Sequence, residues 1–173
     1  MRRRAGFTLI ELLIVMAIIA ALMAVLTPTA TGAMRKATAT KIAVQLRNVE
    51  QAVEQYLYSM LPEPGDLSRA PYNDLANDDD FKDFANVQLL DDGEVDIRII
   101  PDTNNNRIRI ALRYTAANSV IAELIVGTLR EAYGGGTTKD LNSLDDVDEN
   151  TDDGAYYNNT NVFIIKSIDA FWW

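Results

Sequence analysis

The sequence contains no cysteine and no histidine. Without cysteine it can form no disulfide, no thiolate metal site and no cysteine nucleophile. Without histidine it lacks the commonest general base and the commonest zinc ligand, which excludes serine-histidine-aspartate hydrolysis and the usual zinc hydrolysis. We therefore expect that the chain is not an enzyme.

Basic residues are scarce beyond the first third of the chain. Residues 1–58 carry seven basic and three acidic side chains, whereas residues 59–173 carry nine basic and 22 acidic ones. This asymmetry indicates a basic stem beside a membrane and an acidic portion in water. Because so acidic a portion repels phosphate groups, we expect no direct nucleic-acid partner.

One long hydrophobic run, residues 7–26, stands alone in the sequence. As a helix at about 1.5 Å per residue it spans roughly 30 Å, the thickness of the hydrocarbon core of a bilayer. Arg2, Arg3 and Arg4 precede it, and basic residues stay on the cytoplasmic side. The pattern predicts a single-pass membrane protein whose amino terminus is cytoplasmic.

Glu11 is the one charged residue inside this run. A carboxylate deep in a bilayer costs about 2.5–3.5 kcal/mol and usually marks a functional site with a partner. No lysine, arginine or histidine occurs between Arg4 and Arg35. The expected partner is therefore an amine on another copy of the chain, or a newly created amino terminus.

Two other interpretations of the run are open. A secretory signal peptide would have the same basic start and apolar middle, with a cut among the small residues 30–33. A plain single-pass anchor would explain the length and the orientation. Neither gives Glu11 a role.

The segment Gly6-Phe7-Thr8-Leu9-Ile10-Glu11, behind a basic leader and before an apolar run, resembles the processing motif of type IV pilins and the related pseudopilins of type II secretion. Pro28 falls where many members of that family have a helix-bending proline. The resemblance covers about residues 1–60.

The resemblance implies roles for three residues. Prepilin peptidase would cut after Gly6 and methylate the new amino terminus, Phe7, and Glu11 would attract the amine of a neighbouring subunit. The implied partners are identical or related pilin subunits, the peptidase, and a pilus or secretion assembly platform. The implied location is the inner membrane, followed by an extracytoplasmic or cell-surface filament.

Helical periodicity continues beyond the run. Pro28 and Gly32 predict a kink or a melted stretch over residues 26–33, or alternatively the end of the membrane helix at the interface. An apolar face then recurs at steps of three and four residues, and Pro62 ends the helix near Met60. The residues of this face are Ile42, Leu46, Val49, Val53, Leu57 and Met60.

These patterns predict a cleaved leader (1–6), a transmembrane and filament-core helix (7–27), an amphipathic stem helix (28–61) and an acidic head (62–173). In the head we expect a short helix at 80–85, strands at 94–100 and 107–114, a helix at 116–132, a polar loop at 134–160 and a last strand at 161–168. The fold class is α+β and pilin-like, with a long helix packed on a small antiparallel sheet.

Two acidic stretches are candidate calcium sites. One is the alternating set Asp102, Asn104 and Asn106. The other is a loop that contains Asp146, Asp148, Asn150, Asp152 and Asp153. Neither has the glycine and the closing glutamate of an EF-hand, and a solvated turn is the alternative for both. Major pseudopilins of type II secretion carry a calcium site near the carboxyl end, which favours the second stretch. Calcium is the one cofactor that these patterns suggest.

We interpret the chain as a structural subunit of a type IV pilus-like filament. A type II secretion pseudopilin, whose filament would push secreted proteins through a channel, shares every residue of this interpretation. The third possibility is a membrane-anchored extracytoplasmic binding domain, in which Glu11 would be dispensable.

Overall fold

The computed structural model describes residues 7–135, 141–148 and 151–173. The chain divides into two compact units, Met1–Ala37 and Thr38–Trp173. In the first unit, the described residues begin at Phe7. The second unit contains the sheet and the remaining helices.

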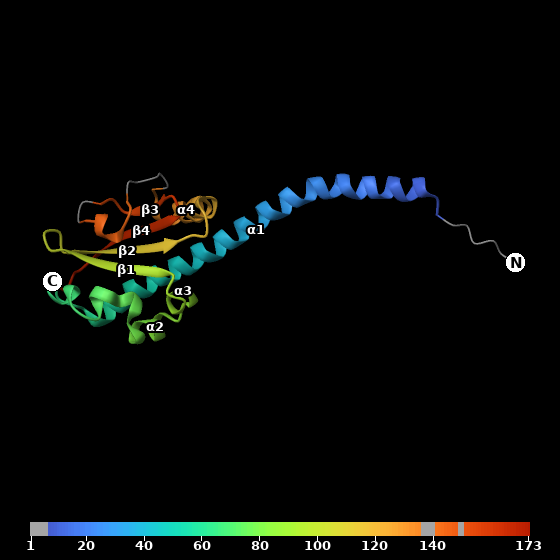
Figure 1. Cartoon of the computed structure of the whole chain (residues 1–173). Coiled ribbons are helices and arrows are strands. Elements are labelled where there is room, and N and C mark those ends of the chain that lie inside the picture. Colours follow the sequence, from blue (N-terminus) through green and yellow to red (C-terminus); the bar gives the residue numbers. More distant parts are fainter. Residues whose placement is uncertain (1–6, 136–140, 149–150) are drawn as a thin grey trace. The chain divides into compact units, whose positions relative to one another are not determined.

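Helix α1, Leu9–Met60, is 52 residues long and is continuous (Figure 1). Pro28 lies inside it, so the expected melted stretch or helix end at residues 26–33 is wrong. Proline removes one backbone donor, but long helix-forming flanks hold the helix together on both sides. The hydroxyls of Thr27 and Thr29 donate to the carbonyls of Met23 and Val25, at 2.8 and 3.1 Å, so these side chains are satisfied within the helix.

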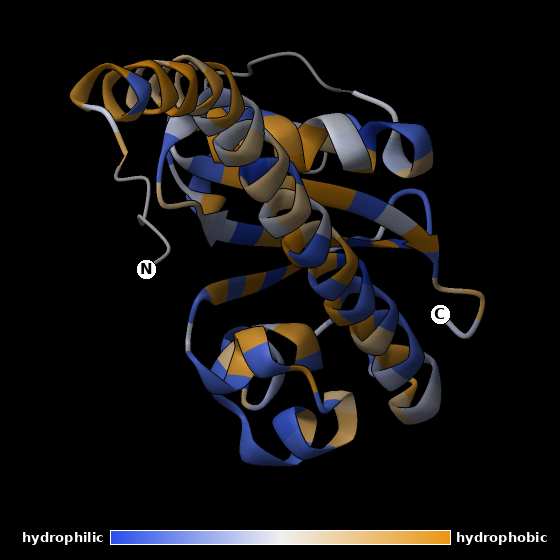
Figure 2. Cartoon of the chain, turned by 90° about the vertical axis from the view of Figure 1, so that its right-hand side faces the viewer, coloured by the Kyte–Doolittle hydropathy of each residue, from blue (hydrophilic) through white to orange (hydrophobic). Residues whose placement is uncertain are grey.

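The first part of α1, up to Ala37, is apolar around its whole circumference from Leu12 to Leu26. Every described residue of this part is exposed within the chain. Figure 2 shows its hydrophobic colouring. By length and composition, α1 is the one helix among the described residues that could cross a membrane.

The second part of α1, from Thr38 to Met60, has one buried face. The expected face is confirmed at Leu46, Val49, Val53 and Leu57, while Met60 is 54% exposed and was wrongly included. Small residues extend the face toward the amino end, where Ala39 and Ala43 are buried. The helix therefore becomes amphipathic only where it meets the head.

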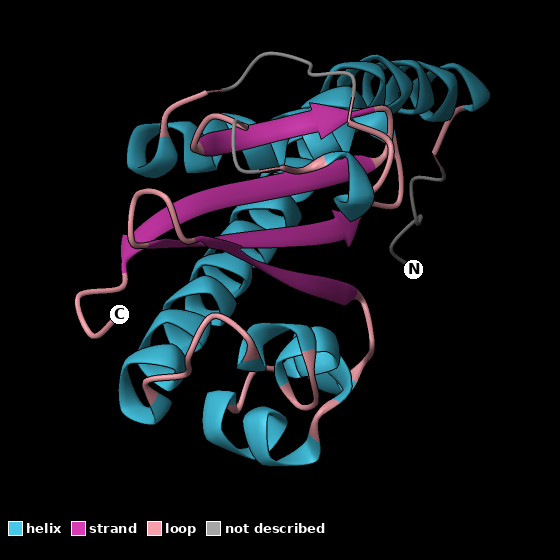
Figure 3. Ribbon diagram, turned by 90° about the vertical axis from the view of Figure 1, so that its left-hand side faces the viewer, coloured by secondary structure: helices cyan, strands magenta, loops and turns pink. Residues whose placement is uncertain are grey.

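The sheet consists of four antiparallel strands in the order β1-β2-β4-β3 (Figure 3). They are β1, Val95–Asp102; β2, Arg107–Thr115; β3, Gly154–Asn158; and β4, Asn161–Asp169. The β1–β2 hairpin and the last strand confirm the predicted segments to within two residues. Strand β3 lies inside the stretch predicted as a polar loop, which was wrong there.

The two faces of the sheet pack against different layers. Ile110, Leu112 and Ile164 face α1 and belong to the larger core. Ala111, Phe163 and Ile165 alternate with them and pack under residues 141–148. Arg98 holds that segment by donating to the carbonyl of Leu144 at 2.6 Å.

The helical elements of the head surround the sheet. Helix α4, Ser119–Tyr133, begins at Asn118, whose side chain accepts the amide of Ile121 at 3.0 Å. Its buried residues are Ala122, Ile125, Val126 and Leu129, whereas Val120 is exposed. The remaining elements are α2, Asp79–Ala85; α3, Gln88–Asp91; and the 3₁₀ turns Asp66–Ser68, Tyr72–Asn77 and Leu144–Asp146.

A side chain covers the edge of β4 beyond the first residue of β3. Gly154, the first residue of β3, pairs with Ile165, so residues 166–169 of β4 extend beyond β3. Asp153 turns its carboxylate onto this stretch, where it accepts the amide of Ser167 at 3.0 Å and its hydroxyl at 2.8 Å. An inward-pointing charge at such a place blocks the addition of a further strand.

The architecture confirms the predicted class. A long amino-terminal helix packs on a small antiparallel sheet, which makes an α+β, pilin-like fold.

Candidate functional site

The first candidate site is the start of α1. Gly6 lies outside the described residues, and Phe7 is described and 89% exposed. Thr8 directly precedes the helix, and Glu11 lies in its first turn. The motif residues from Phe7 to Glu11 are thus together at one helix end.

Thr8 and Glu11 bond reciprocally. The Thr8 amide and hydroxyl both donate to Oε2 of Glu11, at 2.8 and 2.7 Å. The Glu11 amide in turn donates to the hydroxyl of Thr8 at 3.3 Å. This arrangement is a capping box, which satisfies backbone donors that a helix end otherwise leaves without partners.

The capping box fixes a negative charge at the amino end of the helix. The partial positive charge of the helix start stabilises a carboxylate at this position. The backbone nitrogen of Phe7 is one residue before Thr8 and would become an ammonium group if the chain were cut after Gly6. The site can therefore hold a carboxylate and an amine within a few residues of each other.

The surroundings of Glu11 are apolar and uncovered by the rest of the described chain. Leu9, Leu12 and Val25 are 81%, 56% and 69% exposed. Exposed apolar side chains on this scale mark a surface for lipid or for other apolar helices. A charge pair formed there would be strengthened by low dielectric.

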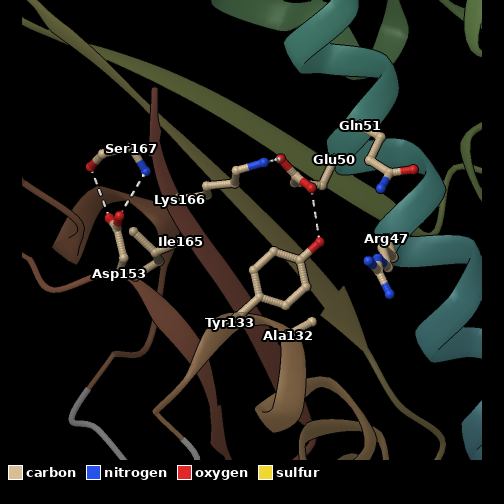
Figure 4. Close-up of a pocket in the computed structure, with 9 residues that line it drawn as sticks. All are labelled: Arg47, Glu50, Gln51, Ala132, Tyr133, Asp153, Ile165, Lys166 and Ser167. Atoms are coloured by element: carbon tan, nitrogen blue, oxygen red, sulfur yellow. Dashed lines mark hydrogen bonds and ion pairs between the residues drawn. The ribbon is translucent and has the colours of Figure 1, made fainter. Parts of the chain in front are cut away.

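Sequence reasoning missed a second cluster of charges in the head. Glu50, a charged residue of the stem part of α1, is 1% exposed. Figure 4 shows its carboxylate between Lys166 of β4 and Tyr133 of α4. Lys166 Nζ lies 2.9 Å from Glu50 Oε1 and 2.6 Å from Glu54 Oε2, and the Tyr133 hydroxyl donates to Glu50 Oε2 at 2.8 Å.

This cluster shifts the titration of two of its members. Burial raises the pKa of Tyr133 far above its usual value, and the negative charge of Glu50 adds to the effect. Partial burial alone would lower the pKa of Lys166, but the bonds to Glu54 and Glu50 outweigh it and raise that pKa. The neutral tyrosine and the charged lysine are the forms that the fold stabilises.

The spacing of apolar residues did contain the signal for Glu50. Leu46, Val53 and Leu57 lie four residues before it and three and seven after it, which is the repeat of one helix face. Likewise, Lys166 shares one face of β4 with Ile164 and Ile168, which both face α1. Reading position before residue type would have placed both charges at the interface of α1 and the sheet.

The cluster borders a cavity of about 290 Å³ between α1, α4 and β4, which Arg47 and Gln51 also line. The charged groups of the cluster form ion pairs with one another. We assign a structural role to this cluster: it holds α1 against the sheet and against α4.

The predicted calcium ligands of the loop are dispersed. Asp146 accepts the amides of Asn142 and Ser143 at 2.8 and 2.9 Å, Asp148 accepts the hydroxyl of Thr151 at 2.8 Å, and Asp153 binds Ser167. Asp152 is exposed, and Asn150 lies outside the described residues. Within residues 7–135, 141–148 and 151–173, no three acidic side chains form a group that could hold a metal ion.

The other calcium candidate is a capped turn. The carboxylate of Asp102 accepts the amide of Asn105 at 3.2 Å and its side-chain nitrogen at 2.8 Å. The bond from the Asn105 side chain lowers the pKa of Asp102. This is the geometry of an Asx turn that closes the β1–β2 hairpin.

Comparison with known proteins bears on the first site. Residues 1–27 match the family model of the prokaryotic N-terminal methylation motif. This is the prepilin-type motif of type IV pilins and pseudopilins, and the predicted resemblance is confirmed over these residues. No curated protein and no solved structure matches the chain.

The motif and the fold together support a subunit of the type IV pilin or pseudopilin kind. Such a motif implies assembly with other pilin subunits. One long apolar helix near the amino terminus fits a single-pass membrane anchor. The motif thus points to a structural subunit.

Proposed function

We propose that the chain is a prepilin, which prepilin peptidase cuts after Gly6 and methylates at Phe7. The product is a structural subunit of a type IV pilus-like filament, held in the inner membrane by α1 before assembly. The observation that carries the proposal is a carboxylate, Glu11, at the start of the exposed, mainly apolar part of α1, which has the methylation motif. Only a partner outside the chain gives both features a use.

Assembly follows from the charges at the helix start. In a membrane, Glu11 without a cation is costly, and the cut creates the missing cation at Phe7. When an assembling subunit approaches, its amine pairs with Glu11 of a neighbour already in the filament, at low dielectric. The attraction fixes the axial register of the two helices, and the apolar surfaces from Leu9 to Leu26 then pack together.

The geometry of the capping box favours a neighbour over the subunit's own amine. Oε2 of Glu11 is already turned inward onto the amide and the hydroxyl of Thr8. A carboxylate has several acceptor sites, so it can keep these bonds and accept an ammonium from outside the helix. The capping box therefore orients Glu11 without removing its charge.

The experiment is the intact mass and the amino-terminal sequence of the chain recovered from membranes. The proposal expects a chain that begins at methylated Phe7. A chain that begins beyond Ala30 would indicate a secreted domain, and one that keeps Arg2, Arg3 and Arg4 would indicate a plain anchor. Either of these results rejects the proposal.

The acidic loop favours one alternative use of the same filament, the pseudopilus of a type II secretion system. That alternative makes Asp146, Asp148, Asn150, Asp152 and Asp153 the ligands of calcium. The test is the thermal midpoint of the full chain with calcium and with an equal concentration of magnesium. A rise specific to calcium favours the pseudopilin, and no rise favours the pilus subunit.

A further inference from the structure

The carboxyl end of the chain lies beside the end of α1 (Figure 1). A row of aromatic rings lies there. Phe171 stacks on Tyr58 with ring centres 6.0 Å apart and an angle of 27° between the planes. Trp172 meets both rings edge-on, at 5.6 and 5.2 Å. Phe171 is 77% exposed, which is unusual for a large aromatic side chain.

The row is firmly held. The indole nitrogens of Trp172 and Trp173 both donate to the carbonyl of Pro62, at 2.9 and 2.8 Å. Two such bonds to one carbonyl fix both rings against the end of α1, so Phe171 is presented by an ordered base. An ordered aromatic surface loses little entropy when a ligand binds.

A polar cavity of about 300 Å³ adjoins this row, and Tyr58 belongs to both. Its other polar lining groups come from α1, β2, β4 and the residue before β3, and they include both donors and acceptors. They are Glu54, Arg107, Asp153, Lys166, Ser167 and Asp169.

Each charged group of the cavity has a partner within the chain, and Asp153 lies 3.9 Å from the Nε of Arg109. Lys166 Nζ is 2.6 Å from Glu54, and Arg107 Nε is 3.1 Å from Asp169. Asp153 accepts the amide and hydroxyl of Ser167. An ion would have to break one of these pairs, whereas a neutral ligand with hydroxyl groups can bond to the remaining lone pairs and hydrogens.

We propose that this cavity and the adjoining Tyr58–Phe171 rings form a binding site for a neutral saccharide. A pyranose has one face of C–H groups, which packs on the negatively polarised face of an aromatic ring. Its hydroxyls act as donors and acceptors together, which suits the mixed lining of the cavity. The site does not depend on the filament proposal, because it uses no residue of the exposed part of α1 before Thr38.

The chain supplies its own probe for the test. Its two tryptophans, Trp172 and Trp173, both lie at the site. The full chain, purified in a detergent without a sugar head group, is titrated with glucose, galactose, N-acetylglucosamine, cellobiose and lactose while tryptophan emission is recorded. At least one of these sugars should give a saturable change, with a dissociation constant on the order of a millimolar, as expected for a small ligand.

Two comparisons identify the interactions. Phe171→Ala should weaken binding about fivefold or more, because a stacking surface is lost. Phe84→Ala, which removes another half-exposed aromatic ring far along the sequence, should not change it. Sorbitol has the hydroxyls but no ring face and should give no saturable change.

The proposal is overturned if none of the five sugars gives saturation, if Phe171→Ala binds as the unaltered chain does, or if sorbitol matches the sugars. A change in tryptophan emission that depends on protein concentration without sugar would assign the surface to contacts between copies, and would also overturn it. Circular dichroism of Phe171→Ala checks that the head is folded. If Phe171→Ala does not fold, Asp169→Asn serves in its place, with the same fivefold expectation.

Discussion

The two parts of α1 belong to one helix and have opposite relations to the rest of the chain. From Leu9 to Ala37 every residue is exposed, although most are apolar. From Thr38 to Met60 the helix buries a face that includes Leu46, Val53 and Leu57. Because apolar surface is stable only when it leaves water, the first part requires lipid or other helices, while the second is completed by its own head.

The glutamates of the two parts differ in the same way. Glu11 is satisfied by Thr8 within its own turn, so the fold of the head does not depend on it. Glu50 is satisfied by Lys166 and Tyr133, which come from other elements of the head. Changes in the first part should therefore affect assembly, and changes at the second should affect folding.

The largest effect is expected from Glu11→Val. It removes the charge that we propose attracts a neighbour's amine, so the number of filaments should fall at least about tenfold while the thermal midpoint of the head is unchanged. Filaments are counted by electron microscopy of sheared cell surfaces or membranes. Glu123→Val, at an exposed position of α4, is the control and should assemble normally. Normal assembly of Glu11→Val would reject the proposed role.

Lys166→Met should have the next largest effect, and on folding. It leaves the Glu50 carboxylate buried without its cation, which should lower the free energy of unfolding by about 3–5 kcal/mol. Denaturant titration followed by tryptophan emission measures this. Lys82→Met on α2 serves as the matched control and should change stability by less than about 0.5 kcal/mol. Equal losses in the two variants would show that the cluster around Glu50 is not what holds α1 to the sheet.

Alkaline pH should act on the same cluster. The raised pKa of Tyr133 means that the folded chain keeps a proton that the unfolded chain loses above pH about 10. Stability is therefore complete below that pH and falls above it, by about 1.4 kcal/mol per pH unit for this residue. Tyr133→Phe should make the fall less steep by that amount. An unchanged slope would mean that Tyr133 titrates freely in the folded head.

The smallest effect concerns the start of α4. Asn118→Ala removes the side-chain oxygen that accepts the amide of Ile121, which should cost about 1 kcal/mol of stability. Asn48→Ala, at an exposed position of α1, should be neutral or slightly stabilising. Urea midpoints of the two variants give the comparison. A loss no larger for Asn118→Ala than for Asn48→Ala would contradict the capping role.

Local patterns in the sequence predicted the elements whose formation depends on local interactions. The long helix, the β1–β2 hairpin and α2 follow from periodicity and from turn residues next to them. Strand β3 was missed because Gly154–Asn158 has no apolar alternation of its own, and its extended form comes from pairing with β4. Pro28 was overestimated as a helix breaker because its local cost was weighed without the length of helix around it.

The same limit applies to the sites. The start of α1 was predicted from its sequence motif, although the bonds between Thr8 and Glu11, three residues apart, were not predicted. The cluster of Glu50, Tyr133 and Lys166 could not be predicted from residue type, because its members are brought together only by the tertiary fold. The row of Tyr58, Phe171 and Trp172 has the same origin, since the carboxyl end of the chain returns to the end of α1.

The carboxylate of Asp153 on the free stretch of β4 bears on how many ways copies of this chain can join. A head with an open strand edge would have a second adhesive surface, and crowded heads could then link sideways into branched or irregular aggregates. With the Ser167 amide occupied, that end of β4 offers no ready template for another strand. In the proposed filament this stretch of β4 is therefore not a surface through which heads link, and subunits joined only through their apolar helices would extend as a single line.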